Sequence, residues 1–313
     1  MKLMVKIFFF LFIMMTAETR AQDSLWIFSY FKNNGEDGLH LAYSEDALHW
    51  KALRGDSSVL TPTAGYDKLM RDPCITRGGD GRFHMVWTSS WKERGIGYAS
   101  STDLVHWTPQ QYLLVMDHEP QAKNCWAPEI FYDRSSDLYM IYWASTITGR
   151  FPATDTLGDH NHRMYYVTTK DFKTFSKTKL LYNQGFNVID ASIYKINSQY
   201  LMFLKDETLK PKAEKNIRIA SSKKLLTGYG KPSPPITGNY WAEGPTLLEN
   251  KGEYILYFDK YMEHQYGAIR STNLKDWEDI SSRIKVPEGL RHGTIIKISR
   301  KEFEQLEKGI KSL

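Results

Sequence analysis

Short hydrophobic runs alternate with polar turns along most of the chain, and one composite pattern returns five times. Each copy is an apolar strand followed by Ser or Thr residues, a charged or polar turn and a closing aromatic ring. The copies are residues 39–50, 96–107, 164–175, 217–229 and 267–277. Copies at near-regular intervals indicate an internal repeat, which decides the fold assignment. The closing Trp50, Trp107 and Trp277 recur at one position of the repeat and are expected in the core.

A second pattern interleaves with the first and predicts a hairpin in each unit. It starts at a small or polar residue and continues into two hydrophobic strands that flank a turn. The starts are Asp72, Ala127, Asp190, Glu243 and His292, and the turns are residues 78–81, 135–137, 197–198 and 250–252. Gly, Asn, Asp and Ser dominate these turns, as tight hairpins require. Residues 253–258 alternate with the period of a strand rather than a helix.

Each unit therefore holds about four short strands, which predicts an all-β protein with the fold of a five-bladed β-propeller. The fifth copy lacks its second strand, while residues 25–31 provide a spare strand before the first unit. We expect this N-terminal strand to complete the last blade and close the ring. A β-sandwich would also have many short strands, but not two interleaved repeats. One short C-terminal helix is predicted at residues 301–310, with Ser299 and Glu302 as its capping box, at the propeller edge.

The N-terminus has the pattern of a secretory signal peptide. Lys2 and Lys6 precede an apolar run at residues 7–15, and small residues at positions 19 and 21 mark a cleavage site before Gln22. The run is too short to span a bilayer, and a buried N-terminal helix is the alternative. The expected division is a signal peptide, residues 1–21, and a single catalytic propeller domain, residues 22–313.

Two further absences in the sequence bear on localisation. No cysteine near the cleavage site supports lipid anchoring, and no later segment approaches 18 consecutive apolar residues. We therefore expect an exported protein, periplasmic or secreted, with no membrane span.

Composition limits the partners of such a protein. The 313 residues include 41 Lys and Arg, 36 Asp and Glu and 14% aromatic residues, so a disordered chain is excluded. Part of the formal charge of +5 belongs to the N-terminal leader, and no block of basic residues occurs, so nucleic acid is not expected as a partner. Two cysteines exclude a disulfide-stapled scaffold and a Cys-rich zinc module. Cys74 and Cys125 lie on or just before neighbouring inner strands. They could form a disulfide between blades or remain two free thiols.

The starting residues of the second pattern are the main chemical candidates. In a propeller the innermost strand of each blade runs along the central channel, so the first residues of these strands surround one opening. Asp72, Ala127, Asp190, Glu243 and His292 would then share that opening. Three carboxylates and a histidine on one axis are costly to bury unless they are solvated, paired or used in chemistry. This ring is the predicted functional site.

The motifs around these positions resemble the blade starts of glycoside hydrolase family 43. They are Arg-Asp-Pro at 71–73, Trp-Ala-Pro-Glu at 126–129, Ile-Asp-Ala-Ser-Ile at 189–193, Ala-Glu-Gly-Pro at 242–245 and Arg-His-Gly-Thr at 291–294. They cover essentially the whole mature chain in the order of the family. The resemblance implies a five-bladed propeller that hydrolyses arabinose-, xylose- or galactose-containing plant polysaccharides with inversion. It also implies that Asp72 is the general base, Asp190 the carboxylate that tunes or orients the acid, and Glu243 the general acid.

The chemistry of glycoside cleavage agrees with this assignment. One carboxyl group must be protonated near neutral pH and another ionised, on opposite sides of the scissile bond. Asp72 and Glu243 on non-adjacent blades would leave room for a water molecule between base and sugar. A charged Asp190 on the blade next to Glu243 would raise the pKa of Glu243 by repulsion and keep it an acid.

Three classes of function compete. The leading hypothesis is an α-L-arabinofuranosidase, with β-xylosidase and exo-galactanase as alternatives in the same family. The related fructan hydrolases also use Arg-Asp-Pro, but they follow the acid by Cys, whereas Gly244 follows Glu243 here. The alternative of another class is a non-catalytic carbohydrate-binding propeller, which would usually have replaced one of the three acids.

Several neighbours of the ring are candidates for binding. Arg71, Trp126 and Trp241 could contact a sugar, although tryptophans in a propeller often pack between blades. His292 could contact substrate, hold a structural calcium ion in the channel, or form hydrogen bonds to nearby carboxylates. No cofactor is otherwise required, and an oligosaccharide or polysaccharide is the partner that the sequence indicates.

Two other features have two interpretations each. Glu129 lies two residues beyond Ala127 and is either a fourth active carboxylate or, as we expect, a scaffold residue paired with a basic neighbour. Residues 146–162 form a long loop over the channel mouth, where loops often set substrate length. Its His160 and His162 lack a third metal ligand at suitable spacing, so a substrate-contacting or solvated loop is favoured.

Overall fold

The computed structural model describes residues 24–155 and 160–313. The predicted signal peptide and the cleavage site before Gln22 lie outside the described residues. Within the described ranges, no helix has the length and apolar character needed to cross a membrane.

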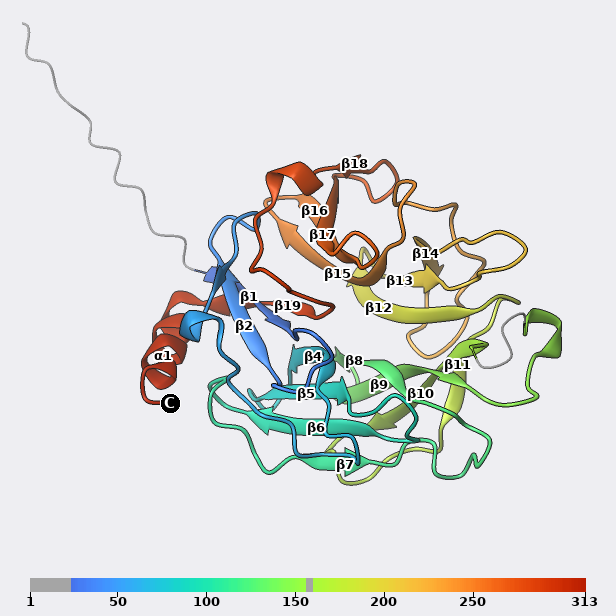
Figure 1. Ribbon diagram of the computed structural model, residues 1–313, viewed down its shortest axis with the longest axis horizontal. Coiled ribbons are helices and arrows are strands. Elements are labelled where there is room, and N and C mark those ends of the chain that lie inside the picture. Colours follow the sequence, from blue (N-terminus) through green and yellow to red (C-terminus); the bar gives the residue numbers. More distant parts are fainter. Residues whose placement is uncertain (1–23, 156–159) are drawn as a thin grey trace, which may run out of the picture.

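Five sheets surround a central axis as the blades of a propeller, which confirms the predicted fold (Figure 1). From the axis outward, blade 1 contains β4 (Arg71–Arg77), β5 (Phe83–Thr88), β6 (Ile96–Ser101) and β7 (Gln111–Leu113). Blade 2 contains β8 (Trp126–Asp133), β9 (Leu138–Thr146), β10 (His162–Thr169) and β11 (Lys179–Tyr182). Blade 3 contains three strands rather than the four predicted for each unit: β12 (Val188–Ile196), β13 (Gln199–Asp206) and β14 (Asn216–Ser222). Blade 4 contains β15 (Glu243–Asn250), β16 (Glu253–Lys260), β17 (Gln265–Ser271) and β18 (Glu278–Asp279).

Blade 5 closes the ring with strands from both ends of the chain. Its order from the axis is β19 (Thr294–Ser299), β1 (Ser24–Tyr30), β2 (His40–Ser44) and β3 (Lys51–Ala52). β1 and β19 pair antiparallel, with Ile27 opposite Ile296, so the predicted closure by the N-terminal strand is confirmed. The two strands approach closely at Gly293, where a Cβ atom would lie 1.7 Å from the carbonyl oxygen of Ser29. Only glycine fits there, because the clash would be with backbone.

The short C-terminal helix seals the outer edge between blades 5 and 1. α1 (Arg300–Ile310) starts at Ser299, whose hydroxyl accepts from the backbone N–H of Glu302 in a complete capping box. Its Phe303, Leu306 and Ile310 are buried against the apolar side chains of these two blades. The predicted helix is thereby confirmed, and Figure 1 shows it at the rim. The part of the chain that the structure describes also contains three single-turn 3₁₀ helices: η1 (Arg54–Asp56), η2 (Pro152–Thr154) and η3 (Ser281–Arg283).

Apolar side chains between neighbouring blades form the core. Trp50 is buried between blades 4 and 5, with its ring 5.1 Å from that of Phe28. Trp107 and Trp277 are partly buried and pack against two other core clusters. The recurring tryptophans therefore serve packing, as their position in the repeat predicted.

Cys74 and Cys125 are both buried and both free. Of the two alternatives that the sequence allowed, the structure has two thiols and not a disulfide. The Cys74 thiol donates to Oε2 of Glu129 at 3.5 Å, and the Cys125 sulfur accepts from the Ser145 hydroxyl at 3.8 Å. Each sulfur thus has its own polar neighbour.

Candidate active site

Four inner strands start with the same local kink, which gives the candidate carboxylates their direction. The pairing of β4 with β5 shifts register between Arg71 and Cys74, and β8, β12 and β15 shift at the equivalent point. The residue inside each kink has a positive φ: 52° at Asp72, 44° at Ala127, 50° at Asp190 and 60° at Gly244. Non-glycine residues rarely adopt this conformation, and bulges that impose it are common beside active sites.

This register corrects the position predicted for Glu243. Aligning Glu243 with Asp72 and Asp190 is wrong by one residue, because Gly244 occupies the kink and Glu243 aligns with Arg71. The sequence requires glycine at 244, since a Cβ atom there would lie 2.4 Å from Cγ of His292. Glu243 therefore enters the site one residue upstream of the position from which the two aspartates enter it.

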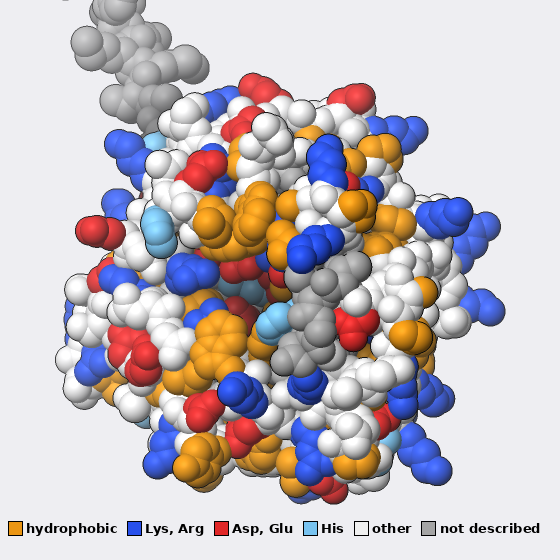
Figure 2. Space-filling view, turned by 45° about the vertical axis from the view of Figure 1, so that its right-hand side comes forward, with side chains coloured by type: hydrophobic (Ala, Val, Ile, Leu, Met, Phe, Trp, Pro, Cys, Tyr) orange, Lys and Arg blue, Asp and Glu red, His pale blue; other side chains and the backbone are white. Residues whose placement is uncertain are grey.

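His292 lies between the two aspartates at the floor of the channel mouth. Its Nδ1 is 3.3 Å from Oδ1 of Asp72 and 3.8 Å from Oδ2 of Asp190. The Thr88 hydroxyl donates to Oδ2 of Asp72 at 2.8 Å, and the Gly244 N–H donates to Oδ2 of Asp190 at 3.0 Å. The space-filling view shows this face hollowed, with acidic and histidine side chains at the floor and hydrophobic ones around the rim (Figure 2).

The floor residues have strongly shifted proton affinities. Burial alone would raise the pKa of Asp72, but the hydrogen bond to His292, the charges of His292 and Arg71 and the Thr88 hydroxyl together lower it to about 2. Burial would lower the pKa of His292, but its contacts with Asp72 and Asp190 raise it to about 9. Asp72 is therefore ionised and His292 protonated at neutral pH. The candidate base is thus an anion that a buried cation contacts.

Asp190 and Glu243 have pKa values shifted in opposite directions. Burial raises the pKa of Asp190 to about 7, and repulsion from Glu243 adds to this effect while His292 opposes it. Burial acts in the same direction on Glu243, but the ammonium of Lys205 and the guanidinium of Arg291 outweigh it and lower the pKa of Glu243. The prediction that Asp190 keeps the pKa of Glu243 high is therefore wrong.

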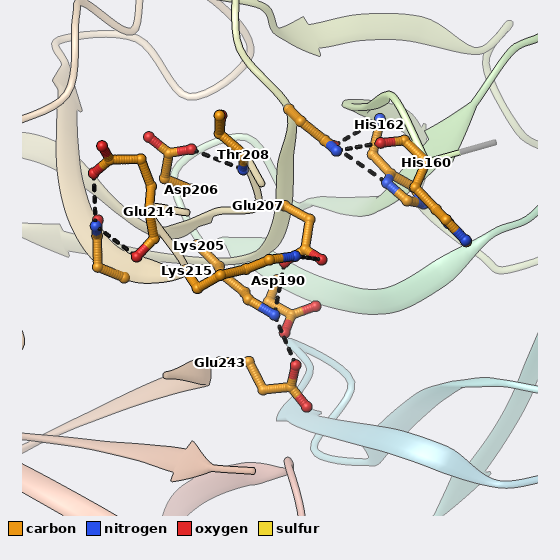
Figure 3. Close-up of polar contacts among 12 residues, drawn as sticks. His160, His162, Asp190, Lys205, Asp206, Glu207, Thr208, Glu214, Lys215 and Glu243 are labelled. Carbon is orange, nitrogen blue, oxygen red and sulfur yellow. Dashed lines mark hydrogen bonds and ion pairs between the residues drawn. The ribbon is translucent and has the colours of Figure 1, made fainter. Parts of the chain in front are cut away.

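Two cations that the sequence motifs did not indicate contact Glu243. Nζ of Lys205 lies 2.9 Å from Oε2 of Glu243, and Nη2 of Arg291 lies 3.4 Å from Oε1 (Figure 3 shows the lysine). The signal for Lys205 was its place in a strand of buried apolar residues, where an unpaired ammonium is not tolerated. Arg291 was noticed only as part of the motif before β19.

The predicted substrate-binding residues lie on two sides of the opening. Arg71 stacks between two rings, 4.7 Å from Phe31 and 4.2 Å from Trp91, and donates to Oδ1 of Asn34. Trp126 is half-buried and donates from Nε1 to the carbonyl of Trp91 at 3.0 Å. These residues form one aromatic wall beside Asp72.

Trp241 belongs to the opposite side, next to Glu243. Its half-buried ring lies 5.9 Å from that of Tyr261 and 5.5 Å from Nζ of Lys215. His292, in contrast, is 5% exposed beneath the aspartates. This position suits a residue that acts through Asp72 and Asp190 rather than one that touches a sugar.

Glu129 lies deeper in the channel than the ring. It is buried, and with Cys74 and Thr294 it lines a cavity of about 370 Å³ along the inner strands. Burial raises its pKa to about 7. Among the described residues its hydrogen-bond partner is the Cys74 thiol, so the expected pairing with a basic neighbour is wrong.

The segment between β9 and β10 lies at the mouth end of blade 2, as predicted for residues 146–162, and residues 156–159 of it lie outside the described part. His160 and His162 stack beside Trp126, with ring centroids 5.7 and 4.8 Å from it. Burial lowers the pKa of His162 to about 3. These rings extend the aromatic wall.

The donor set at the channel mouth does not fit a bound cation. In residues 24–155 and 160–313, no three His, Cys, Asp or Glu side chains are grouped to hold a metal ion. Nδ1 of His292 faces two carboxylates as an imidazolium, and it already supplies the positive charge that a calcium ion would bring.

Buried carboxyl groups that differ in protonation at one channel mouth are what acid-and-base hydrolysis of a glycoside requires. Residues 23–304 match the family described as a probable glycosyl hydrolase domain, related to glycoside hydrolase family 43. The match spans most of the chain, so the protein belongs to this family, and the resemblance predicted from the five motifs is confirmed.

Individual relatives are more distant. An α-L-arabinofuranosidase of Bifidobacterium longum subsp. longum is 25% identical in an alignment over 199 residues, and the match covers 56% of this chain and 19% of that protein. The matched part thus spans about a fifth of this curated relative. The crystal structure of an α-L-arabinofuranosidase from Lactobacillus brevis aligns with a TM-score of 0.54 at 19% identity, covering 68% of this chain and 72% of that one. A thermostable family-43 glycoside hydrolase aligns with a TM-score of 0.55 at 18% identity, covering 71% and 78%. At these identities the solved structures show a shared fold.

Proposed function

We propose that the protein is an exported, inverting glycoside hydrolase that removes sugar side chains from plant-type polysaccharides or oligosaccharides, with α-L-arabinofuranosidase as the leading activity. The observation that carries the proposal is the difference between Asp72, which is ionised at neutral pH, and Asp190, whose pKa is raised to about 7 beside Glu243 at the same opening. Acid-and-base hydrolysis requires this difference. The sugar is supported by the sequence similarity to the Bifidobacterium arabinofuranosidase.

In this mechanism Asp72 takes a proton from a water molecule as the water oxygen attacks the anomeric carbon. The bond to the leaving oxygen breaks, and Glu243 donates the proton that this oxygen needs. Asp190, whose pKa is raised by burial and by repulsion from Glu243, would hold this proton before substrate binds, and Glu243 would take it up as the substrate enters. Inversion follows because water attacks from the face opposite the leaving group.

The two sides of the opening would divide the substrate. Trp126 and Arg71 lie beside the base and would contact the sugar that is released, while Trp241 lies beside the acid and would contact the leaving group. Aromatic rings suit these roles because sugar rings present C–H faces that pack on them. His292 would orient Asp72 and Asp190 without touching the sugar.

No cofactor has a step in this mechanism, because the imidazolium of His292 provides the buried positive charge. Dialysis against EDTA should leave both the rate and the melting temperature unchanged. A loss of activity that calcium restores would show that the channel holds a required metal ion.

The test of the function is a screen of 4-nitrophenyl α-L-arabinofuranoside, β-D-xyloside and β-D-galactoside, followed by proton NMR of the first product before mutarotation. We expect hydrolysis, fastest for the arabinofuranoside, with an anomer opposite to that of the substrate. Retention would contradict the assignment of Asp72 as general base. Sugar binding by calorimetry without hydrolysis of any substrate would favour the non-catalytic carbohydrate-binding alternative.

A further inference from the structure

A buried lysine lies behind the candidate acid and takes no part in the mechanism above. Lys205, near the end of β13, is 2% exposed, so its ammonium cannot reach a substrate in the channel mouth. Nζ contacts Oε2 of Glu243 at 2.9 Å and Oε2 of Glu207 at 2.7 Å, and it lies 4.4 Å from the ring centroid of Tyr261. The ammonium is therefore shared between two carboxylates, with an aromatic face on a further side.

Glu207 is itself held in place. Its Oε1 pairs with Nζ of Lys215, which is also buried, and Lys215 lies against the ring of Trp241. Glu243, Lys205, Glu207 and Lys215 thus form a row of alternating charge, visible in Figure 3. Because Lys215 fixes Glu207, this carboxylate stays in contact with the ammonium of Lys205 and partly neutralises its charge.

The other charges around Glu243 are less closely engaged with it. Arg291 contacts Glu243 at 3.4 Å but Asp259 at 2.5 Å, so most of its charge is compensated by Asp259. His292 is placed between Asp72 and Asp190. The ionisable groups facing Glu243 are thus Asp190 from β12, Lys205 from β13, Asp259 from β16, Tyr261 after β16, and Arg291 and His292 before β19. Among these cations, Lys205 makes the shortest contact.

We propose that Lys205 is a positioning residue that fixes one carboxylate oxygen of Glu243, and that Glu207 weakens the charge that Lys205 exerts on it. Where activity is the readout, the inference rests on the function proposed above. If Lys205 contacted Glu243 alone, its ammonium would keep Glu243 ionised and unable to act as an acid. If Lys205 were absent, no ammonium would orient the Glu243 carboxylate. Sharing Lys205 between Glu243 and Glu207 keeps the acid both oriented and able to accept a proton.

Removing the cation and removing the second anion of the row should shift the pKa of Glu243 in opposite directions. In Lys205→Met the basic limb of kcat/KM should rise by about one pH unit or more, because the acid keeps its proton longer. In Glu207→Gln the same limb should fall, because Lys205 then acts on Glu243 alone. Both variants should lower kcat with little change in KM, since neither side chain touches substrate. Lys195→Met, which removes a lysine 5.3 Å from the Tyr200 ring at the far end of β12, is the matched control and should change neither limb.

A second measurement does not depend on catalysis. The carboxyl carbon of Glu243, labelled with ¹³C and assigned by its loss in Glu243→Gln, can be titrated by NMR in the free protein. Its midpoint should rise in Lys205→Met and fall in Glu207→Gln. If Lys205→Met does not fold, because Glu243 and Glu207 are left unpaired, Glu207→Gln and Lys205→Arg carry the test. Lys205→Arg keeps the charge, so its midpoint should stay near that of the wild type while kcat falls.

Unchanged midpoints in Lys205→Met and Glu207→Gln, or shifts in the same direction, would overturn the proposal and leave Lys205 a structural residue. This outcome differs from failure of the proposed function. A wild-type protein that hydrolyses none of the three aryl glycosides would remove the hydrolase assignment, whereas the NMR titration would still decide the role of Lys205.

Discussion

Nδ1 of His292 lies 3.3 Å from Oδ1 of Asp72, and this contact joins the blade that closes the ring to blade 1. The candidate base thus contacts a residue that lies shortly before β19, the inner strand of blade 5. The N-terminal β1 pairs with this strand and completes the blade. The charge state of the base consequently depends on a histidine that the ring-closing blade provides.

This pair should contribute stability that depends on pH. The pKa of His292 is raised from 6.5 to about 9 on folding, so its contribution is fully present below pH 6.5 and is lost as pH rises through about 9. His292→Gln should therefore lower the free energy of unfolding more at pH 6 than at pH 10. The difference between the two losses should be on the order of 3 kcal/mol. Urea unfolding at the two pH values measures the difference.

The control is His106→Gln, which removes an exposed histidine that contacts Asp103 at 2.7 Å. Exposed pairs of this kind contribute little, so its effect should be small at both pH values. A His292→Gln penalty that is the same at pH 6 and pH 10 would show that the histidine stabilises the protein by packing alone.

The acid and the base should differ in how their loss depends on the leaving group. Glu243→Ala should nearly abolish hydrolysis of natural oligosaccharides but spare a dinitrophenyl glycoside more, because a good leaving group needs no proton. Asp72→Ala should slow both substrates by factors of hundreds or more, since both need an activated water. Steady-state rates on the two substrate types give the comparison. Equal damage to both from Glu243→Ala would contradict its role as the acid.

Asp190→Asn should act on the same proton. Without the Asp190 carboxyl, whose pKa is about 7, the proton can bind only to Glu243, whose pKa is lowered by Lys205 and Arg291, so the basic limb of kcat/KM should move to lower pH. A pH profile measured on an aryl glycoside checks the direction. A basic limb that stays in place while kcat falls would indicate that Asp190 orients the acid without tuning it.

The two cysteines should be unreactive until the protein unfolds. Burial raises the pKa of Cys125 to about 12 and that of Cys74 in the same direction, so neither sulfur is a thiolate at pH 8. A thiol-specific chromogenic reagent should detect no thiol in the native protein and two after denaturation, with one remaining in Cys125→Ser. No reaction after denaturation would mean that the export route oxidises the pair.

Export itself can be read from the mass of the protein. The leader pattern predicts cleavage before Gln22, so protein recovered from outside the cytoplasm should begin there by intact mass spectrometry. Exported material that still begins at Met1 would contradict the prediction.

The sequence by itself determined the architecture. Two interleaved patterns that return in each unit, with apolar and polar residues alternating along the strands, predict four-stranded units. The unmatched strand at residues 25–31 predicts closure by the N-terminus. Ser299 and Glu302 predict the start of the helix. These features depend on local alternation and local hydrogen bonds, which neighbouring residues are sufficient to specify. The same repeat placed Asp72, Asp190 and His292 at one opening.

Tertiary structure decided the chemistry at that opening. The kink in β15 has Gly244, and not Glu243, at the ring position, so Glu243 enters the site one residue earlier in its strand than the two aspartates do. The charge state of Glu243 depends on Lys205 from another blade, and Glu129 pairs with Cys74 across two blades. A pKa depends on through-space distances and burial, and these exist only after strands far apart in the sequence have packed together.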